Sequence, residues 1–173
     1  MTKADSDRRP LLRAFVGAGS NIEPLEHLRA AMTELEKRFG ALSMSSLYRT
    51  ASVGFDGEDF LNLVVSFETD LPVAEVVAQL DEVEAQAGRR REGSRFSSRT
   101  LDLDLLMYGD RVVDREGVRL PREDILEYAF VLGPLAELDP DLRHPTADAT
   151  MLELWSGFDQ QDQSIMRLDE GLN

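Results

Sequence analysis

The run from Arg95 to Asp104 combines residues that could carry out transfer chemistry on a charged substrate. It ends in Leu-Asp-Leu-Asp, which places Asp102 and Asp104 two positions apart in an apolar, strand-like stretch. Three consecutive arginines, Arg89–Arg91, lie just upstream. Carboxylates that hold a metal ion, next to arginines that hold phosphate, are the groups that transfer from a nucleoside triphosphate requires. The spacing therefore indicates a candidate phosphate and metal site.

The two aspartates are expected to share one face of a strand, because side chains two positions apart point the same way. A rise of about 3.3 Å per residue puts their Cα atoms roughly 6.6 Å apart, on the side away from Leu101, Leu103 and Leu105. Such a pair suits Mg²⁺, which accepts a few carboxylates together with phosphates and water. The alternative is two solvated aspartates on an exposed sheet face. Aspartate is a poor strand former, however, so two of them in mid-strand need a reason.

The composition describes an ordinary globular chain with a strong negative charge. The chain has 173 residues, of which 42% are hydrophobic and 30% charged. We expect one domain over 1–173, with a core at about 11–158 and flexible ends at 1–9 and 159–173. The net charge of -14 opposes binding to nucleic acid or to an anionic membrane surface. Five arginines between Arg89 and Arg99 stand out against it, as an anion site or as a solvated basic loop.

The sequence predicts a cytoplasmic protein. It contains no cysteine, which excludes disulfides and thiolate metal sites and fits a reducing compartment. Residues 1–10 have no apolar segment of the kind found in a secretory signal. The apolar stretches are too short to span a bilayer. We therefore expect small-molecule ligands, no nucleic acid or membrane partner, and a monomer.

The apolar periodicity predicts an α+β fold with the element order β-α-β-β-α-β. Strands are expected at 11–18, 42–50, 61–68 and 101–107, and helices at 24–39 and 72–87. Ser20 with Glu23 matches a capping box for the first helix, and Gly40 and Gly88 end the two helices. This order is typical of a ferredoxin-like antiparallel sheet with both helices on one face. A hairpin at 111–120 and short helices at 125–138 and 151–155 complete the prediction.

Two competing site types are excluded. The segment Gly17–Ile22 imitates the start of a dinucleotide-binding loop, but Ile22 stands where glycine is required and the element order is not doubly wound. The two histidines, His27 and His144, have no partners at metal-ligand spacing. Each is expected to be structural or solvated.

Five segments in this order and spacing resemble the 6-hydroxymethyl-7,8-dihydropterin pyrophosphokinase family, over residues 12–155. They are Gly19–Asn21, Ser46–Thr50, Phe60–Asn62, Arg99–Asp104 and Phe130–Leu135. The resemblance implies a ferredoxin-like fold. It also implies transfer of the β,γ-pyrophosphoryl group of ATP to the hydroxymethyl oxygen of the pterin, with release of AMP, in folate biosynthesis.

The resemblance also implies roles for individual residues on the ATP side. Asp102 and Asp104 would hold two Mg²⁺ ions. Arg89, Arg91 and Arg99 would bind phosphates, Arg95 and Phe96 would lie on a loop that closes over ATP, and Glu84 would lie near the nucleotide. Acidic and basic side chains suit this reaction, because phosphoryl transfer depends on charge neutralisation and positioning rather than on a covalent intermediate with the protein.

On the acceptor side, the resemblance implies that Phe60 and Phe130 stack on the two faces of the pterin ring. Asn62 would hydrogen-bond the edge of the pterin, and Thr50 and the backbone near Val53 would meet its polar rim. The alternatives are ordinary core phenylalanines and a solvated asparagine.

The chain departs from the family pattern at several positions. It has Ala51–Gly54 for Pro-Pro-x-Gly, Phe96 for a tryptophan, Ser98 for a proline, Arg122 for a histidine and Tyr128 for an arginine. Arg122 could supply phosphate charge in place of that histidine. Two alternatives to the pyrophosphokinase follow. One is a catalytically weakened ferredoxin-like module that binds pterin or nucleotide, and the other is a transferase with a different acceptor.

Overall fold

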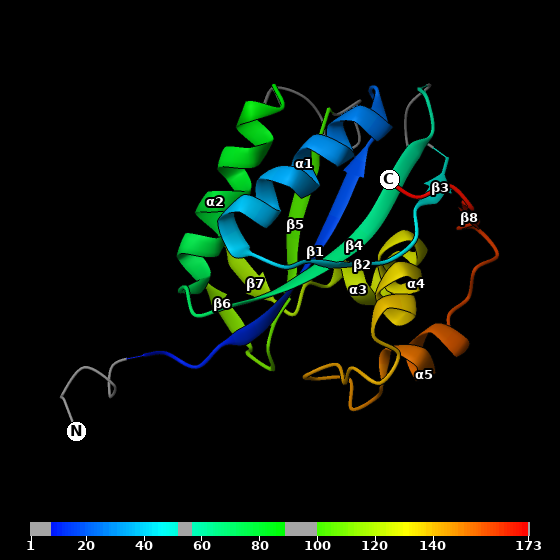
Figure 1. Ribbon diagram of the computed structural model, residues 1–173. Coiled ribbons are helices and arrows are strands. Elements are labelled where there is room, and N and C mark those ends of the chain that lie inside the picture. The colour runs from blue at the N-terminus through cyan, green and yellow to red at the C-terminus, as the bar shows by residue number, and fades with distance from the viewer. Residues whose placement is uncertain (1–7, 52–56, 89–99, 173) are drawn as a thin grey trace.

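The computed structural model describes residues 8–51, 57–88 and 100–172. Eight strands are described: β1 (Leu12–Ser20), β2 (Ser43–Met44), β3 (Tyr48–Thr50), β4 (Phe60–Thr69), β5 (Asp102–Tyr108), β6 (Val113–Arg115), β7 (Val118–Leu120) and β8 (Ile165–Arg167). The helices in this part of the chain are α1 (Pro24–Phe39), α2 (Val73–Gln86), α3 (Asp124–Glu127), α4 (Ala129–Leu138) and α5 (Met151–Ser156). Figure 1 shows their arrangement.

The main sheet has the order β5-β1-β4-β3-β8, with β2 also paired to β4. The pairings of β1 with β4 and β5, and of β4 with β3, are antiparallel. This order, with α1 and α2 crossing the same face, is the ferredoxin-like arrangement that the element pattern predicted (Figure 1). The predicted hairpin is confirmed as the separate β6-β7 sheet.

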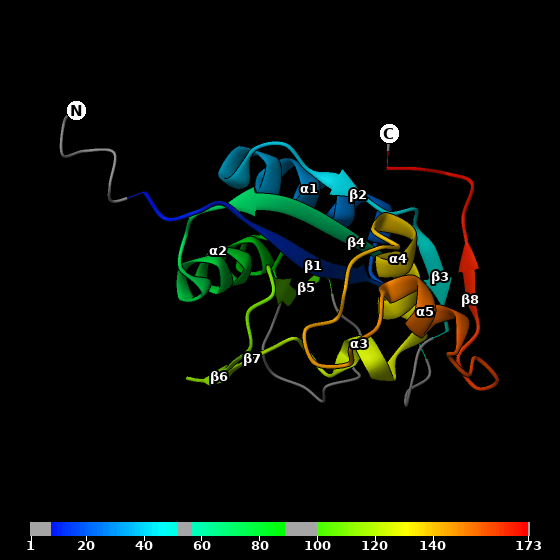
Figure 2. The ribbon, with the colours of Figure 1, turned by 90° about the horizontal axis from the view of Figure 1, so that it is seen from below.

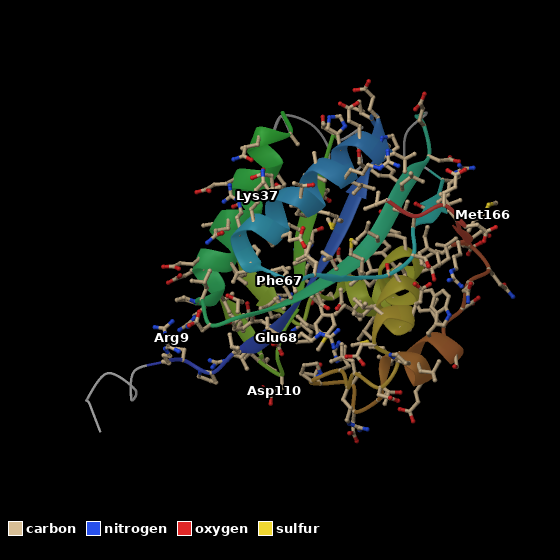
Figure 3. The ribbon with its side chains drawn as sticks, viewed as in Figure 1. Arg9, Lys37, Phe67, Glu68, Asp110 and Met166 are labelled. Atoms are coloured by element: carbon tan, nitrogen blue, oxygen red, sulfur yellow. The ribbon has the colours of Figure 1, made fainter. Side chains whose placement is uncertain are left out.

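The first core lies between the sheet and helices α1 and α2. Alternate residues of β4 point into it, and Phe67 stacks on Phe39 of α1 with ring centroids 4.1 Å apart. Glu68, the next residue along β4, is exposed, as the alternation requires (Figure 3). From α1 the helical stripe contributes Leu28 and Leu35, which are fully buried. These features confirm the predicted amphipathic pattern.

A second core covers part of the opposite face, where the prediction had placed no helices. It joins Phe15 and Val64 of the sheet to residues of α3, α4 and α5 (Figure 2). The register between β1 and β5 shifts by one residue between Phe15 and Val16, so Leu106 and Met107 both join this core. Met107 therefore does not continue the face of Leu101, Leu103 and Leu105, because a bulge reverses the alternation of the strand.

The structure differs from the prediction at three local features near the ends of elements. Glu23, in a left-handed conformation, precedes α1 without a side-chain cap, so the predicted capping box is wrong. Ser20 instead belongs to β1, and its hydroxyl donates to the carbonyl of Thr100. The strand expected at 42–50 is split because the Ser45 hydroxyl accepts the Val64 N–H, which a strand carbonyl would otherwise bind.

The segment 159–173, expected to be flexible, contributes a strand. Residues of β8 pair antiparallel with β3, and Leu168 N–H donates to the Leu47 carbonyl. In Figure 1 the segment after α5 runs along the outer side of α4 to reach β3. Among the described residues, no helix is long and apolar enough to cross a membrane.

Candidate active site

Asp102 and Asp104 lie on the second face of β5, as predicted. Both are half-buried, whereas Leu101, Leu103 and Leu105 are buried in the first core. Across the ladder, Asp102 pairs with Gly19 and Asp104 pairs with Gly17 of β1. Glycine has no side chain, so the strand next to the aspartates presents only backbone on this face. The two carboxylates therefore lie opposite a stretch of β1 backbone, Gly17 to Gly19, that we call the glycine floor.

Two hydrogen bonds fix the start of β5. Glu84 of α2 is only 3% exposed, and its Oε1 accepts the N–H of Leu103 at 2.7 Å. Ser20 holds the carbonyl of Thr100 from the other side. Because Leu103 lies between the two aspartates, the Glu84 bond sets the position of both. The nucleotide contact implied for Glu84 stays a prediction.

Arg122 lies beside the aspartates. Its Nη1 is 3.6 Å from Asp104 Oδ1 and its Nη2 is 3.3 Å from Asp124 Oδ2. Its backbone N–H donates to the Leu106 carbonyl of β5, which fixes the residue against that strand. Burial opposes the charge on Arg122, but Asp104, Asp124 and Asp102 outweigh it and raise the pKa of the guanidinium. In this structure the cation predicted to hold phosphate thus pairs with Asp104 and Asp124.

Asn62 is buried next to the glycine floor. It is 7% exposed, and its Nδ2 donates to Thr50 Oγ1 at 2.9 Å. A Cβ on Gly19 would lie 2.7 Å from Asn62 Oδ1, so the asparagine occupies the space that the glycine leaves. The alternative of a solvated Asn62 is therefore wrong. The structure brings Thr50, Asn62 and Gly19 together on the face that carries Asp102.

The two predicted stacking rings come from different elements. Phe60 begins β4 and Phe130 lies in the first turn of α4, and both are half-buried. The Phe130 ring stacks on Tyr128, with centroids 5.1 Å apart and an angle of 26° between the planes. Tyr128 therefore supports Phe130 at the position where the family often has arginine. The sandwich of a pterin between Phe60 and Phe130 stays a prediction.

Several predicted residues lie outside the described part of the chain. They are Val53 of the acceptor rim and the ATP-side residues Arg89, Arg91, Arg95, Phe96 and Arg99. Conversely, sequence reasoning missed two contributors. Gly19 lies just beyond the strand predicted at 11–18, so its position opposite Asp102 was not expected, although a glycine inside a strand signals close approach of another group. Asp124 was also missed, although it lies only two positions after Arg122 in the chain and accepts a hydrogen bond from its guanidinium.

The aspartate pair fits magnesium better than a metal that needs a full protein shell. In the part of the chain that the structure describes, no group of three or more histidine, cysteine or acidic side chains could hold a metal. Two carboxylates fill only part of a metal coordination shell, which leaves positions for the phosphate oxygens and water that Mg²⁺ prefers. The carboxylates of Asp102 and Asp104 therefore suit a Mg²⁺ ion that binds together with a nucleotide.

The ferredoxin-like sheet presents paired carboxylates and an arginine on one face, and these groups suit the binding of a metal ion and of phosphate. Residues 15–140 match the family described as 7,8-dihydro-6-hydroxymethylpterin-pyrophosphokinase. The chain belongs to this family, as the sequence motifs indicated.

Two bacterial relatives support the assignment, and both are named 2-amino-4-hydroxy-6-hydroxymethyldihydropteridine pyrophosphokinase. The protein from Pseudomonas aeruginosa is 36% identical over 137 residues, which cover 77% of this chain and 84% of the relative. The protein from Haemophilus influenzae is 33% identical over 141 residues, or 79% of this chain and 88% of the relative.

The fold is also found in the wild-type HPPK-DHPS of Plasmodium falciparum. The two structures superpose with a TM-score of 0.70 at 12% sequence identity. The match covers 87% of this chain and 45% of the Plasmodium chain. At this identity the similarity supports the fold alone.

Proposed function

We propose that this chain is an ATP-dependent pyrophosphokinase. It transfers the β,γ-pyrophosphoryl group of ATP to the hydroxymethyl oxygen of 6-hydroxymethyl-7,8-dihydropterin and releases AMP. The observation that carries the proposal is the placement of Asp102 and Asp104 on one sheet face. They lie beside the glycine floor that leads to Asn62. The groups that we propose for metal binding and for acceptor binding thereby share one surface.

Asp102 and Asp104 would hold Mg²⁺, with two ions as the proposed number. When bound, Mg²⁺ neutralises phosphate charge and draws the triphosphate and the attacking hydroxyl together. Glu84 and Ser20 keep both carboxylates in place, since they fix the backbone of β5 on either side of Asp102. Arg122 can move from Asp104 to a phosphate oxygen once a cation takes over that carboxylate.

The acceptor would lie on the glycine floor near β4. Asn62 offers its amide to the pterin edge, with Thr50 holding the amide in one orientation. Phe60 and Phe130 would cover the two faces of the ring. Arg89, Arg91, Arg95, Phe96 and Arg99 remain the proposed ATP-side residues, and Val53 a proposed backbone contact.

The test is AMP formation by the purified protein with ATP, Mg²⁺ and 6-hydroxymethyl-7,8-dihydropterin. We expect turnover in the wild type and a loss of at least about 10²-fold in Asp102→Asn, because a metal-binding charge is removed. Asp110→Asn, in an exposed turn after β5, is the matched control and should retain activity (Figure 3). Circular dichroism of both variants checks folding.

An absence of AMP from the folded wild type would overturn the proposal. Tight binding of pterin or nucleotide under the same conditions would then identify the weakened binding module. Turnover with another alcohol but not with the pterin would instead indicate a transferase with a different acceptor. Either outcome would point to two features as the cause of the changed activity. They are the altered loop Ala51–Gly54 and the stack of Tyr128 on Phe130.

A further inference from the structure

We infer that the C-terminal segment 158–168 braces the acceptor pocket and that Gln163 is its positioning residue. The segment lies beyond residues 15–140, which match the family. It links β3, which carries Thr50, to α4, which carries Phe130. The acceptor assigned to this pocket rests on the proposed function, whereas the links themselves are observed contacts.

Gln163 closes the junction between α3 and α4. Its Oε1 accepts the N–H of Ala129 at 2.9 Å, and its Nε2 donates to the Glu127 carbonyl at 2.9 Å. Glu127 ends α3 and Ala129 begins α4, so both groups are helix-end groups that lack helical partners. One side-chain amide therefore fixes the backbone on both sides of Tyr128. The direction of the neighbouring Phe130 ring follows from that fixed backbone.

The other end of the segment is attached to β3. Ile165 pairs with Thr50 and Arg167 pairs with Tyr48 in the antiparallel ladder. The Ile165 side chain also packs on α4 at Gly133. The approach is so close that a Cβ added to Gly133 would lie only 2.7 Å from Ile165 Cδ1. The same residue thus contacts the strand of Thr50 and the helix of Phe130. It thereby forms one direct link between these two elements.

A polar network repeats this link one turn further along α4. Glu137 accepts hydrogen bonds from Tyr48 Oη and from the Ser46 N–H, each at 2.5 Å. Arg167 of β8 places its Nε 3.4 Å from Glu137 Oε2 and 2.9 Å from Ser46 Oγ. The network therefore joins β8, β3 and α4 by charged and neutral hydrogen bonds.

The sheet order separates this brace from the metal side of the site. β8 and β3 form one edge, whereas β5 with Asp102 and Asp104 forms the opposite edge (Figures 1 and 2). Loosening the brace should widen the acceptor pocket without moving the aspartates. Loss of the Gln163 side chain should therefore weaken acceptor binding and leave nucleotide binding intact.

The experiment compares Gln163→Ala with Gln161→Ala. Gln161 is exposed in the same segment, and its side chain makes no hydrogen bond to any described residue. We expect Gln163→Ala to raise the KM for the pterin roughly five- to twentyfold, since two hydrogen bonds are lost. The KM for ATP should change less than about twofold in both variants. Gln163→Glu keeps the acceptor for Ala129 and should fall between wild type and Gln163→Ala.

Amide hydrogen exchange at Ala129 tests the clamp without catalysis. We expect faster exchange in Gln163→Ala and wild-type protection in Gln161→Ala. An unchanged pterin KM in an active Gln163→Ala protein would overturn the brace, as would an equal rise of both KM values. If the wild type formed no AMP, the proposed function would fail on its own. Unchanged exchange at Ala129 would then decide against the clamp independently.

Discussion

At the scale of single residues, the candidate site is a balance between two carboxylates and one arginine. Arg122 contacts Asp104 and Asp124, and the nearby Asp102 also favours its charge. A divalent cation that binds Asp104 must compete with this guanidinium. The phosphates of ATP can offer Arg122 a replacement partner. Metal binding and nucleotide binding should therefore be coupled through Arg122.

The first prediction is that Arg122→Gln tightens divalent-cation binding to the nucleotide-free protein. We expect Mn²⁺, titrated by electron paramagnetic resonance, to bind about two- to fivefold more tightly, since a competing partly exposed ion pair is removed. Arg119→Gln removes an equal charge from the hairpin, where Arg119 contacts Glu123, and serves as the control. Weaker binding in Arg122→Gln than in the control would contradict the proposed competition.

The second prediction concerns the space shared by Gly19 and Asn62. In Gly19→Ala the new Cβ would lie 2.7 Å from Asn62 Oδ1, so the amide must rotate away from Thr50. We expect a loss of roughly 1–3 kcal/mol of stability and an increase in the pterin KM. Thermal melts and steady-state kinetics measure these effects.

Gly17→Ala provides the comparison for stability. Its Cβ would meet Leu106 Cδ1 at 3.5 Å, which is an ordinary contact. Gly17→Ala should therefore lower the melting temperature less than Gly19→Ala does. Equal melting temperatures for Gly19→Ala and the wild type would show that the strand tolerates a side chain beside Asn62.

At the scale of elements, the carboxylate of Glu137 supplies polar contacts between α4 and the sheet edge. Glu137 projects from α4 to Tyr48 and Ser46, and Arg167 of β8 approaches it from outside. Burial tends to raise the pKa of Glu137, but the hydrogen bonds from Tyr48 and Ser46 and the charge of Arg167 together lower it. The ionised form is thus favoured in the folded protein.

The third prediction is an acid-dependent loss of this contact. A carboxyl group with a folded-state pKa below its unfolded value of 4.5 stabilises the protein above that pH. This stabilisation is lost as the pH falls through the lowered value. Glu137→Gln should therefore melt below the wild type at neutral pH, and the difference should shrink at acidic pH. The exposed Glu68→Gln, on β4, is the control variant (Figure 3).

Thermal melts between neutral and acidic pH measure the effect. A gap between Glu137→Gln and the wild type that stayed constant down to the lowest pH would mean that ionisation of Glu137 does not hold α4 to the sheet. The brace formed by the C-terminal segment would then depend on Gln163 and Ile165 alone.

At the scale of the whole molecule, charge repulsion acts against folding. The chain has 33 acidic and 19 basic residues, which gives the net charge of -14. Such a charge destabilises the compact state by self-repulsion, and salt screens it over a Debye length of about 10 Å at 0.1 M. Stability should therefore increase with ionic strength.

The fourth prediction is that NaCl raises the melting temperature by a few degrees between about 0.02 and 0.3 M. The double variant Glu26→Lys with Glu75→Lys exchanges two exposed acids. It changes the net charge from -14 to -10, because each exchange adds two charges. Its salt dependence, measured by calorimetry, should be shallower. A melting temperature that fell with salt in the wild type would show that attractive ion pairs outweigh repulsion.

The local pattern of apolar residues was sufficient to predict the order of the main helices and strands. It was also sufficient to predict the side of β5 on which the two aspartates lie. Alternation along Leu101–Leu105 and the helical stripes of α1 and α2 record which face each element buries, and burial is the dominant stabilising term. The family motifs were also readable, because they are short and contiguous. The buried face of each element and the family motifs each depend on residues that are close together in the sequence.

Tertiary structure alone decided the features that join distant residues. The bulge at Leu106, the contact of Arg122 with Asp104 and the attachment of β8 to β3 have no periodic signature. Gln163 reaches across 36 positions to Glu127, and nothing in the polar segment around it marks that partner. Such contacts form only after the sheet and helices have packed, since packing determines which polar groups meet. The face of the aspartate pair was thus determined by sequence, whereas its counter-ion was determined by the fold.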